Sequence, residues 1–193
     1  MSIASATTTT TRRVWPPVVG LVAIMWAAEL LDAALPYDAD QLGIQSRSIS
    51  GLLGIPLAPF LHGGFGHLLA NTLPFVVLGL LVSWRAGSQF WRVVITIVLG
   101  SGLGVWLLGP SNTVTLGASA LVFGFLTYLI ASGFRTRHWL DVVVGIAVLL
   151  TYGSLLWGAL PFFVAPGISW LGHLCGAVSG VVAAFLFAPR RTP

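Results

Sequence analysis

Three separated stretches of the sequence place a serine and several imidazoles where they could carry out acyl transfer. His62, His67 and Asn71 lie close together, Ser119 follows much later, and His173 lies near the C-terminus. A serine hydroxyl becomes a useful nucleophile when a base accepts its proton, and histidine, with an unperturbed pKa of about 6.5, is the usual base near neutral pH. We therefore expect Ser119 to be a nucleophile and His173 to be its base.

Acyl transfer also requires hydrogen-bond donors for the negative charge that develops on the substrate oxygen. Losing one such donor typically costs about 100-fold in rate. His67 and Asn71 are four residues apart, so on a helix they share one face and could supply donors together with the backbone N–H of Ser119. His62 precedes this pair, in the segment that leads into the same helix.

The residues expected around the base are aromatic or small. Phe123 lies one helical turn after Ser119, so its ring would pack against the His173 imidazole and orient it without a carboxylate. Gly176 and Gly180 follow His173 on one face of a helix, where small residues let a neighbouring helix approach closely. This spacing predicts that the helix of His173 packs against the backbone of another helix.

Metal catalysis is a competing interpretation, because three of the histidines are expected on one side of the molecule. The sequence contains no His-Glu-x-x-His pattern, and no acidic residue adjoins these histidines. Its single cysteine, Cys175, is not enough for a thiolate metal site or an intramolecular disulfide. We therefore expect no metal and no other cofactor.

The elements that position these groups are predicted to be membrane helices. Of the 193 residues, 7% are charged and 56% are hydrophobic, and the mean hydropathy is +0.95, beyond what a water-soluble domain carries. A helix needs about 20 mostly apolar residues to cross a hydrocarbon core. Six stretches qualify, approximately Val14–Leu35, Phe65–Trp84, Phe90–Leu108, Leu116–Gly133, Leu140–Leu160 and Ile168–Ala188. The expected fold class is an all-α membrane protein with six transmembrane helices.

Charge is distributed unequally between the two sides of such a bundle. The chain has nine arginines, no lysine and five acidic residues, which gives a formal net charge of +4. Except for Arg47, every arginine lies in a terminal segment or in or beside the second and fourth loops, which are on the same side of the bundle as the termini. The positive-inside rule then places both termini in the cytoplasm. Because the basic residues follow the expected cytoplasmic side, they indicate contact with a lipid bilayer and no nucleic-acid binding.

One membrane domain, residues 14–188, is expected between two short cytoplasmic tails. Residues 1–13 are small and hydroxylated, so they cannot bury apolar area and are predicted to be disordered. Residues 189–193 form the second tail. We expect a multi-pass protein of a bacterial cell membrane.

The topology brings the chemical groups to one depth. With a cytoplasmic N-terminus, the second, fourth and sixth stretches all begin at the outer surface, and their first turns hold His67, Ser119 and His173. Charged side chains inside a membrane cost about 2.5–3.5 kcal/mol on insertion scales, and they usually face a bundle interior or a water-filled cavity. We therefore expect a polar pocket that opens to the outside.

Three motifs, in this order, resemble those of the rhomboid proteases. They are HGGFGHLLAN at 62–71, GASA at 117–120 and GHLCG at 172–176, so the resemblance spans the second to the sixth stretch. The chain departs from the family pattern at Ala120, where glycine is usual after the serine. The first outer loop also lacks the Trp-Arg pair that is common in the family, and Arg47 is its only basic residue.

The resemblance implies a catalytic dyad of Ser119 and His173 without an acid. The family's oxyanion and supporting positions match His67, Asn71, His62 and Phe123. The implied activity is that of an intramembrane serine endopeptidase. It would cleave the transmembrane helix of a membrane-protein substrate near the outer membrane face, with the substrate entering sideways between helices.

Two other functions fit the same residues. A rhomboid-like pseudoprotease would bind membrane proteins without cleaving them, which Ala120 would favour if its methyl group disturbs the dyad. A small proton-coupled transporter would use the outer histidines and Glu29, an intramembrane carboxylate, to relay protons.

Overall fold

A computed structural model of the chain describes residues 15–136, 139–163 and 167–188, and its regular structure is almost entirely helical. The α-helices are α1 (Trp15–Ala34), α2 (Ile49–Leu57), α3 (Phe65–Ala86), α4 (Phe90–Leu108), α5 (Ser119–Thr136), α6 (Trp139–Tyr152) and α7 (Trp170–Phe187). The predicted all-α class is therefore confirmed. Both predicted tails, residues 1–13 and 189–193, lie outside the described residues.

Among the described residues, four helical segments are long and apolar enough to cross a membrane. They are Trp15–Ala34, Phe65–Leu108, Ser119–Thr136 and Trp170–Phe187. The second segment contains both α3 and α4, so it accounts for two of the six predicted stretches. The predicted stretch at 140–160 is divided in the structure, because α6 ends at Tyr152 and a 3-10 helix, η4, continues over Gly153–Ala159. A helix satisfies its own backbone hydrogen bonds, as the bilayer interior requires.

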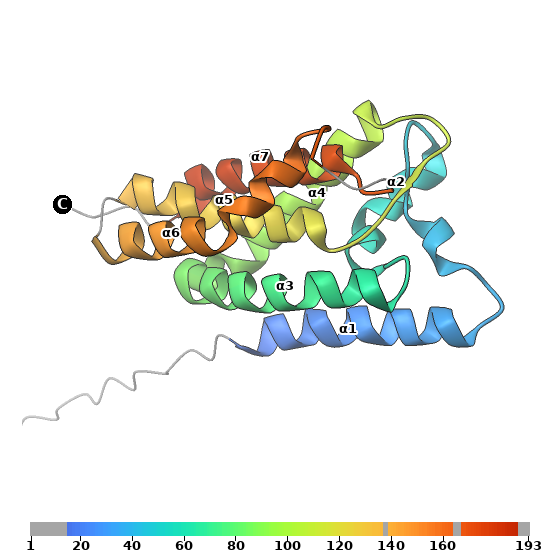
Figure 1. Cartoon of the computed structure of the whole chain (residues 1–193), viewed down its shortest axis with the longest axis horizontal. Helices are drawn as coiled ribbons and strands as arrows, with labels where there is room; N and C mark the ends of the chain where they lie inside the picture. Colours follow the sequence, from blue (N-terminus) through green and yellow to red (C-terminus); the bar gives the residue numbers. More distant parts are fainter. Residues whose placement is uncertain (1–14, 137–138, 164–166, 189–193) are drawn as a thin grey trace, which may run out of the picture.

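The helices α3, α5 and α7 begin at the same end of the bundle, as the sequence predicted (Figure 1). The start of α1 lies at the opposite end. Arg85, Arg92 and Arg135 lie near that opposite end, in the last turn of α3, the first turn of α4 and the last turn of α5. The other arginines predicted on that side, Arg12, Arg13, Arg137, Arg190 and Arg191, lie outside the described residues.

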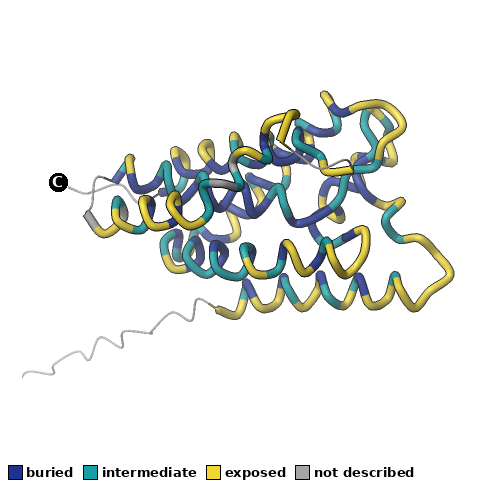
Figure 2. Tube along the Cα trace, in the orientation of Figure 1, coloured by how far each residue is buried: buried dark blue, intermediate teal, exposed yellow. Residues whose placement is uncertain are grey.

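Helix α5 is the central helix of the bundle, and it packs against α3, α4, α6 and α7. Inside the protein, 61% of α5 is buried, compared with 22% of α1 (Figure 2). Phe125 of α5 packs near Phe75 of α3 and Phe90 of α4, with ring centroids 5.5 and 6.3 Å away. Lipid is as apolar as these side chains, so close packing rather than water exclusion holds the helices together.

The contact between α5 and α7 is made by glycines. A side chain on Gly176 would collide with the backbone of Ala120, and one on Gly180 would collide with the α5 backbone and with Thr127. This approach lets the Thr127 hydroxyl donate to the carbonyl oxygen of Ala177 at 2.7 Å, across the two helices. The predicted packing of the small residues against a neighbouring backbone is confirmed.

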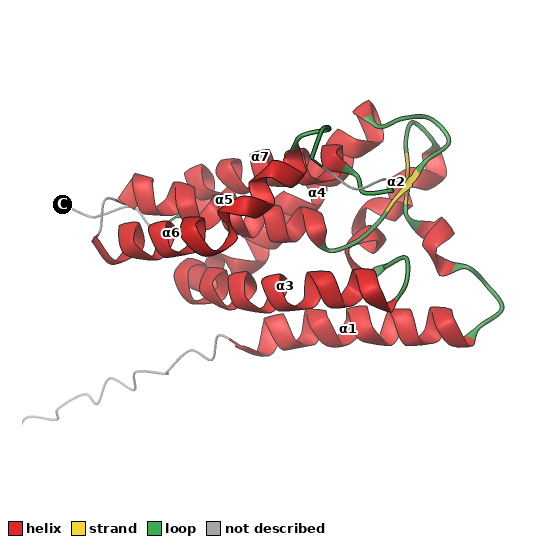
Figure 3. Cartoon of the chain, viewed as in Figure 1, coloured by secondary structure: helices red, strands yellow, loops and turns green. Residues whose placement is uncertain are grey.

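The connection between α1 and α3 is folded rather than a simple loop. It contains the 3-10 helix η1 (Ala39–Leu42), strand β1 (Ile44–Gln45), α2 and the 3-10 helix η2 (Ala58–Phe60). Strand β1 pairs antiparallel with β2 (Val114–Thr115), from the connection that precedes α5 (Figure 3). The pairing joins two connections that are far apart in the sequence at the end of the bundle where α5 begins.

Arg47 attaches this connection to the end of α4. Its guanidinium donates to the carbonyl oxygens of Leu107 and Gly109 at 3.3 and 2.7 Å, and its backbone N–H donates to Trp106 at 3.0 Å. The Trp106 indole donates in return to the carbonyl oxygen of Ser48 at 2.7 Å. The last carbonyls of a helix lack partners inside it and attract cations, so Arg47 is well placed as an anchor.

The glycine contact predicts unequal effects of the same substitution at two positions. Gly180→Ala forces a methyl group into the α5 backbone, which we expect to cost about 1–3 kcal/mol. Gly20→Ala in α1 meets nothing within 4 Å and is expected to be neutral or slightly stabilising. Thermal unfolding in detergent micelles should show a midpoint lowered by several degrees for Gly180→Ala alone. Equal midpoints for the two variants would contradict the close helix contact.

Candidate active site

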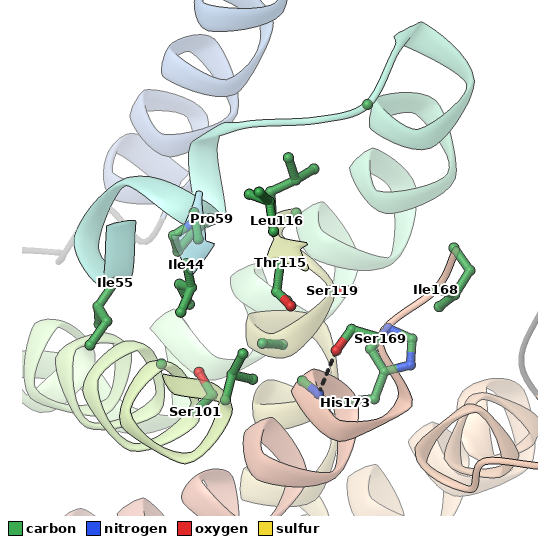
Figure 4. A pocket seen from close by; sticks show the side chains of 18 of the residues that line it. Ile44, Ile55, Pro59, Ser101, Thr115, Leu116, Ser119, Ile168, Ser169 and His173 are labelled. Atoms are coloured by element: carbon green, nitrogen blue, oxygen red, sulfur yellow. Dashed lines mark hydrogen bonds between the residues drawn. The ribbon is translucent and has the colours of Figure 1, made fainter. Parts of the chain in front are cut away.

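A cavity of about 380 Å³ lies at the end of the bundle where α3, α5 and α7 begin. Its lining includes Ser119, His67 and His173, from three different helices, and several of the lining side chains are drawn in Figure 4. Apolar residues from α2, β1 and α4 form much of the remaining wall. Side chains of all three predicted segments therefore line one cavity, whose remaining wall is largely apolar.

Ser119 is the first residue of α5, where the backbone turns sharply. Gly117 has a φ of +109°, a conformation that favours glycine, and its N–H donates to the carbonyl oxygen of Ala58 at 2.8 Å. The first N–H groups of a helix have no partner inside the helix, and the helix dipole makes this end partly positive. The Ser119 side chain and a natural site for a negative charge therefore lie at the same end of α5.

His173 lies in the first turn of α7 and is buried, with 8% of its surface exposed. Ser169 is the N-cap of this helix, and its hydroxyl accepts a hydrogen bond from the N–H of Gly172 at 3.1 Å, the dashed line in Figure 4. His173 Nδ1 lies 2.8 Å from the carbonyl oxygen of Gly158. A carbonyl can only accept, so this bond places the proton on Nδ1 and leaves the lone pair on Nε2.

Phe123 stacks on the His173 ring. The two ring centroids are 4.2 Å apart and the planes differ by 11°. The packing expected from the position of Phe123, one turn after Ser119, is therefore present. Stacking on one face and a hydrogen bond at Nδ1 together restrict rotation of the imidazole, and no carboxylate is involved in either contact.

Gly158 is the residue of this site that the sequence did not reveal. It contributes only a backbone carbonyl, and a side chain at this position would come within 3.1 Å of Phe123 and 3.4 Å of His173 Nδ1. A lone glycine in a chain that has 23 of them carries no distinguishing signal. The tight fit around Gly158 becomes visible only when η4 is placed against α7.

His67 and Asn71 lie on α3 but face different surroundings. The His67 ring lines the cavity and packs against Gly117, where an added Cβ would lie 2.8 Å from its Cε1 atom. Asn71 is buried, and its side-chain amide donates to the carbonyl oxygen of His67 at 3.0 Å. Asn71 is not among the described residues that line the cavity. The structure therefore brings His67 to the cavity wall and leaves Asn71 one turn deeper.

His62 supports the turn before Ser119 from behind the cavity. It is 1% exposed, its Nε2 accepts a long hydrogen bond of 3.4 Å from the N–H of Ala118, and its ring packs edge-on against His67 at 5.2 Å. The pKa of His62 is lowered to about 4, mainly by burial and also by the nearby His67, while the Phe60 carbonyl opposes the shift. His62 Nδ1 has no hydrogen-bond partner among the described residues. His62 is therefore neutral near pH 7.

The Ser119 hydroxyl and the His173 imidazole line the same cavity without a direct hydrogen bond between them in the described structure. Hydrogen bonds between a nucleophile and its base are often long in the absence of substrate and tighten when it binds. Ala120, at the position where the rhomboid proteases that the sequence resembles usually have glycine, also lines the cavity. Its backbone lies against Gly176, so the absence of a side chain on α7 accommodates this close contact.

Comparison with known proteins gives a consistent result. The family model described as the Rhomboid domain matches residues 50–190. An uncharacterized protein of Mycobacterium tuberculosis is 42% identical over 197 residues, covering 96% of this chain and 82% of that protein. The chloroplastic Rhomboid-like protein 11 of Arabidopsis thaliana is 28% identical, covering 68% of this chain and 51% of that protein. Rhomboid-related protein 1 of Caenorhabditis elegans is 25% identical, covering 63% and 36%.

The buried His62 predicts a loss of stability in acid. Its pKa is about 4 in the folded protein and near 6.5 when exposed, so the unfolded chain binds the proton more readily between these values. Stability is therefore fully present above pH 6.5 and falls as the pH decreases towards 4, by on the order of 3 kcal/mol for this group.

The variant His62→Gln keeps a hydrogen-bond acceptor and cannot be protonated. We expect its unfolding midpoint to fall less steeply between pH 6.5 and 4 than that of the wild type. Other groups titrate in both proteins, so the difference between the two pH profiles is the relevant measurement. Parallel profiles would contradict the assignment to His62.

Proposed function

Because the chain belongs to the rhomboid family and is a multi-pass membrane protein, we propose that it is an intramembrane serine endopeptidase with Ser119 as nucleophile and His173 as base. The observation that carries this proposal is the position of the two side chains. They come from different helices and line one cavity, and the Gly158 carbonyl holds His173 with its Nε2 lone pair available. This is the tautomer that a general base needs.

The proposed reaction has two halves, acylation and deacylation, and both use the Ser119 oxygen and His173 Nε2. His173 Nε2 accepts the Ser119 hydroxyl proton as the Ser119 oxygen attacks the carbonyl carbon of the scissile peptide bond. The imidazolium then gives its proton to the leaving amine, the C–N bond breaks, and an acyl-enzyme remains. Water, activated by His173, attacks the ester carbonyl, and the proton returns to the Ser119 oxygen as the acid product leaves.

The oxyanion would lie at the N-terminus of α5. The Ser119 N–H has no partner inside the helix, and the partial positive charge of this helix end favours a negative oxygen. The His67 ring borders the same cavity and would add a side-chain donor. Asn71 would contribute only after its side chain is redirected, because it is not among the described residues that line the cavity and its amide donates to the His67 carbonyl oxygen.

The cavity lies at the bundle end away from the start of α1, which fits a site near the outer face of a bacterial cell membrane. We propose six spans with α6 and η4 forming the fifth, both termini in the cytoplasm, and the described arginines of the opposite end as cytoplasmic anchors. The substrates would be membrane proteins whose transmembrane helix enters sideways from the lipid. Glu29, on which a transporter function would rely, is not among the described residues that line the cavity.

A fluorophosphonate probe tests the nucleophile directly. We expect the probe to label the wild type and not to label Ser119→Ala. The His173→Ala variant should be labelled at least about 100-fold more slowly than the wild type, because the base is lost. Ser101→Ala is a matched control, since Ser101 also lines the cavity but donates to the carbonyl oxygen of Ile97 in its own helix. Its labelling should equal that of the wild type.

Cleavage of single-span membrane substrates in proteoliposomes should follow the same order among the variants. Labelling that persists in Ser119→Ala would exclude the proposed nucleophile. A folded wild type that neither reacts with the probe nor cleaves any of a panel of substrates, yet retains them on purification, would instead indicate the pseudoprotease function.

The stacking of Phe123 on His173 predicts a graded effect on turnover. Such contacts are worth about 0.5–1.5 kcal/mol, which corresponds to a fall in kcat of up to roughly tenfold for Phe123→Leu. Phe123→Tyr keeps the ring and should stay close to the wild type. KM should change little, because Phe123 is not among the described residues that line the cavity. Equal kcat values for the leucine and tyrosine variants would contradict the orienting role.

A further inference from the structure

Two adjoining hollows lie towards the end of the bundle opposite the candidate active site, where α5 and α7 end and α6 begins (Figure 1). The first is a groove of about 140 Å³ between α5 and α6. The second is a hollow of about 470 Å³ beside the last turn of α5, and its described lining is Ala131, Phe134, Arg135 and Phe185. Phe134 lines both hollows, so they are neighbours. The proposed reaction uses neither of them.

The groove between α5 and α6 has the shape and the lining of a site for an acyl chain. All of its described lining residues are apolar or glycine, and a Cβ on Gly145 would lie 3.7 Å from the Ile130 backbone. Along α6 the lining extends from Val142 to Leu149, which is about 10 Å of helix, whereas one leaflet of the hydrocarbon core is about 15 Å thick. A helix is about 10–12 Å across, too wide for this groove.

Arg135 makes the second hollow suitable for an anion. Its guanidinium carbon lies 5.4 Å from the centroid of the Phe185 ring, so the aromatic face holds the cation over α7. No hydrogen bond or ion pair joins Arg135 to the other described residues, and its Nε is buried without an acceptor among them. The terminal nitrogens of an arginine form a planar fork of donors that matches the oxygens of a phosphate.

The charge at this end of the bundle is unbalanced. Arg85, Arg92 and Arg135 all lie here. Four of the five acidic residues fall between positions 29 and 40, at the other end, and the fifth, Asp141, follows the start of α6. A guanidinium beside lipid is costly without a counter-charge, and basic pockets between membrane helices bind anionic lipid headgroups. The charge therefore favours an anionic ligand over a neutral one.

We propose that the two hollows beside Phe134 form a binding site for one anionic phospholipid. Its phosphate would accept hydrogen bonds from the Arg135 guanidinium, and one of its acyl chains would lie in the groove between α5 and α6. Phe134 and Phe185 are 73% and 56% exposed, so both rings face the lipid and border the entrance. In the proposed orientation the ligand comes from the cytoplasmic leaflet, which carries the anionic lipids.

The lipid would join the three helices that meet at this end. Helix α6 packs mainly against α5, and its described residues make few contacts with α7. A headgroup beside Arg135 and Phe185 would contact α5 and α7, while the acyl chain would contact α5 and α6. Binding would therefore stabilise the bundle at the end away from the candidate active site, whether or not the protein cleaves peptides.

Native mass spectrometry of the full chain in detergent micelles tests the site, because it counts bound lipids. The probes are phosphatidylglycerol and phosphatidylcholine with identical acyl chains. We expect one phosphatidylglycerol to bind at least about fivefold more tightly than phosphatidylcholine, the factor that one basic residue near a membrane surface contributes. Phosphatidylglycerol should also raise the thermal unfolding midpoint, and inorganic phosphate should neither raise it nor displace the lipid.

Three variants assign the binding to the proposed residues. Arg135→Gln should lose the preference for phosphatidylglycerol, and Gly145→Leu should weaken the binding of both lipids, because its side chain occupies the groove. Arg92→Gln is the matched control. Arg92 is exposed at the same end and lines neither hollow, and it donates to Gln89. Its lipid binding should equal that of the wild type.

The proposal is overturned if the wild type binds the two lipids equally, a comparison that needs no variant to fold. It is also overturned if Arg135→Gln keeps the preference. If Asp141→Asn and Arg135→Gln lower the midpoint equally and neither lipid has any effect, an internal ion pair replaces the lipid site. If lipid has no effect and a dimer is detected that Gly145→Leu abolishes, a second copy of the chain covers this surface instead. None of these readouts involves proteolysis, so failure of the lipid site and failure of the proposed activity are separate results.

Discussion

The direct contact between the backbones of α5 and α7 is the interaction on which the rest of the structure depends. Gly176 lies against the backbone of Ala120, and Gly180 lies one turn further along the same contact. The serine and the histidine are carried by the first turns of these two helices, so the distance between the helices determines whether the two side chains share a cavity. In lipid, where apolar side chains gain little from association, such close contact is the main attraction between helices.

His173, the proposed base, is oriented by neutral groups, which suits its surroundings. A carboxylate beside His173 would be a further buried charge in a protein that has very few, and burying a charge is costly. The Gly158 carbonyl and the Phe123 ring fix the tautomer and the ring plane without adding charge. Behind them, His62 is kept neutral by burial and accepts the N–H of Ala118, which holds the turn that presents Ser119.

The connections at this end of the bundle form a second layer of support. Arg47 and Trp106 fasten the first connection to the end of α4, and β1 and β2 join it to the segment that leads into Ser119. Asp40, in the connection after α1, lies close to Gly63, one of the residues that line the cavity. The cavity is thus surrounded by folded connections, each attached to a helix that also supports the site.

The sequence by itself determined that the chain is a helical membrane protein, because the apolar stretches are long and their few polar residues lie at comparable positions. It also determined the residue types of the site and its family, since Ser119, His67 and His173 stand in recognisable motifs. Only the tertiary structure decided which residues of these motifs line the cavity. Ser119, His67 and His173 do, whereas Asn71 is not among the described lining residues. The Gly158 carbonyl and the Arg47 anchor were likewise decided by folding. The physical reason is that every residue has a carbonyl and charged side chains are long, so their partners depend on the path of the chain rather than on local spacing.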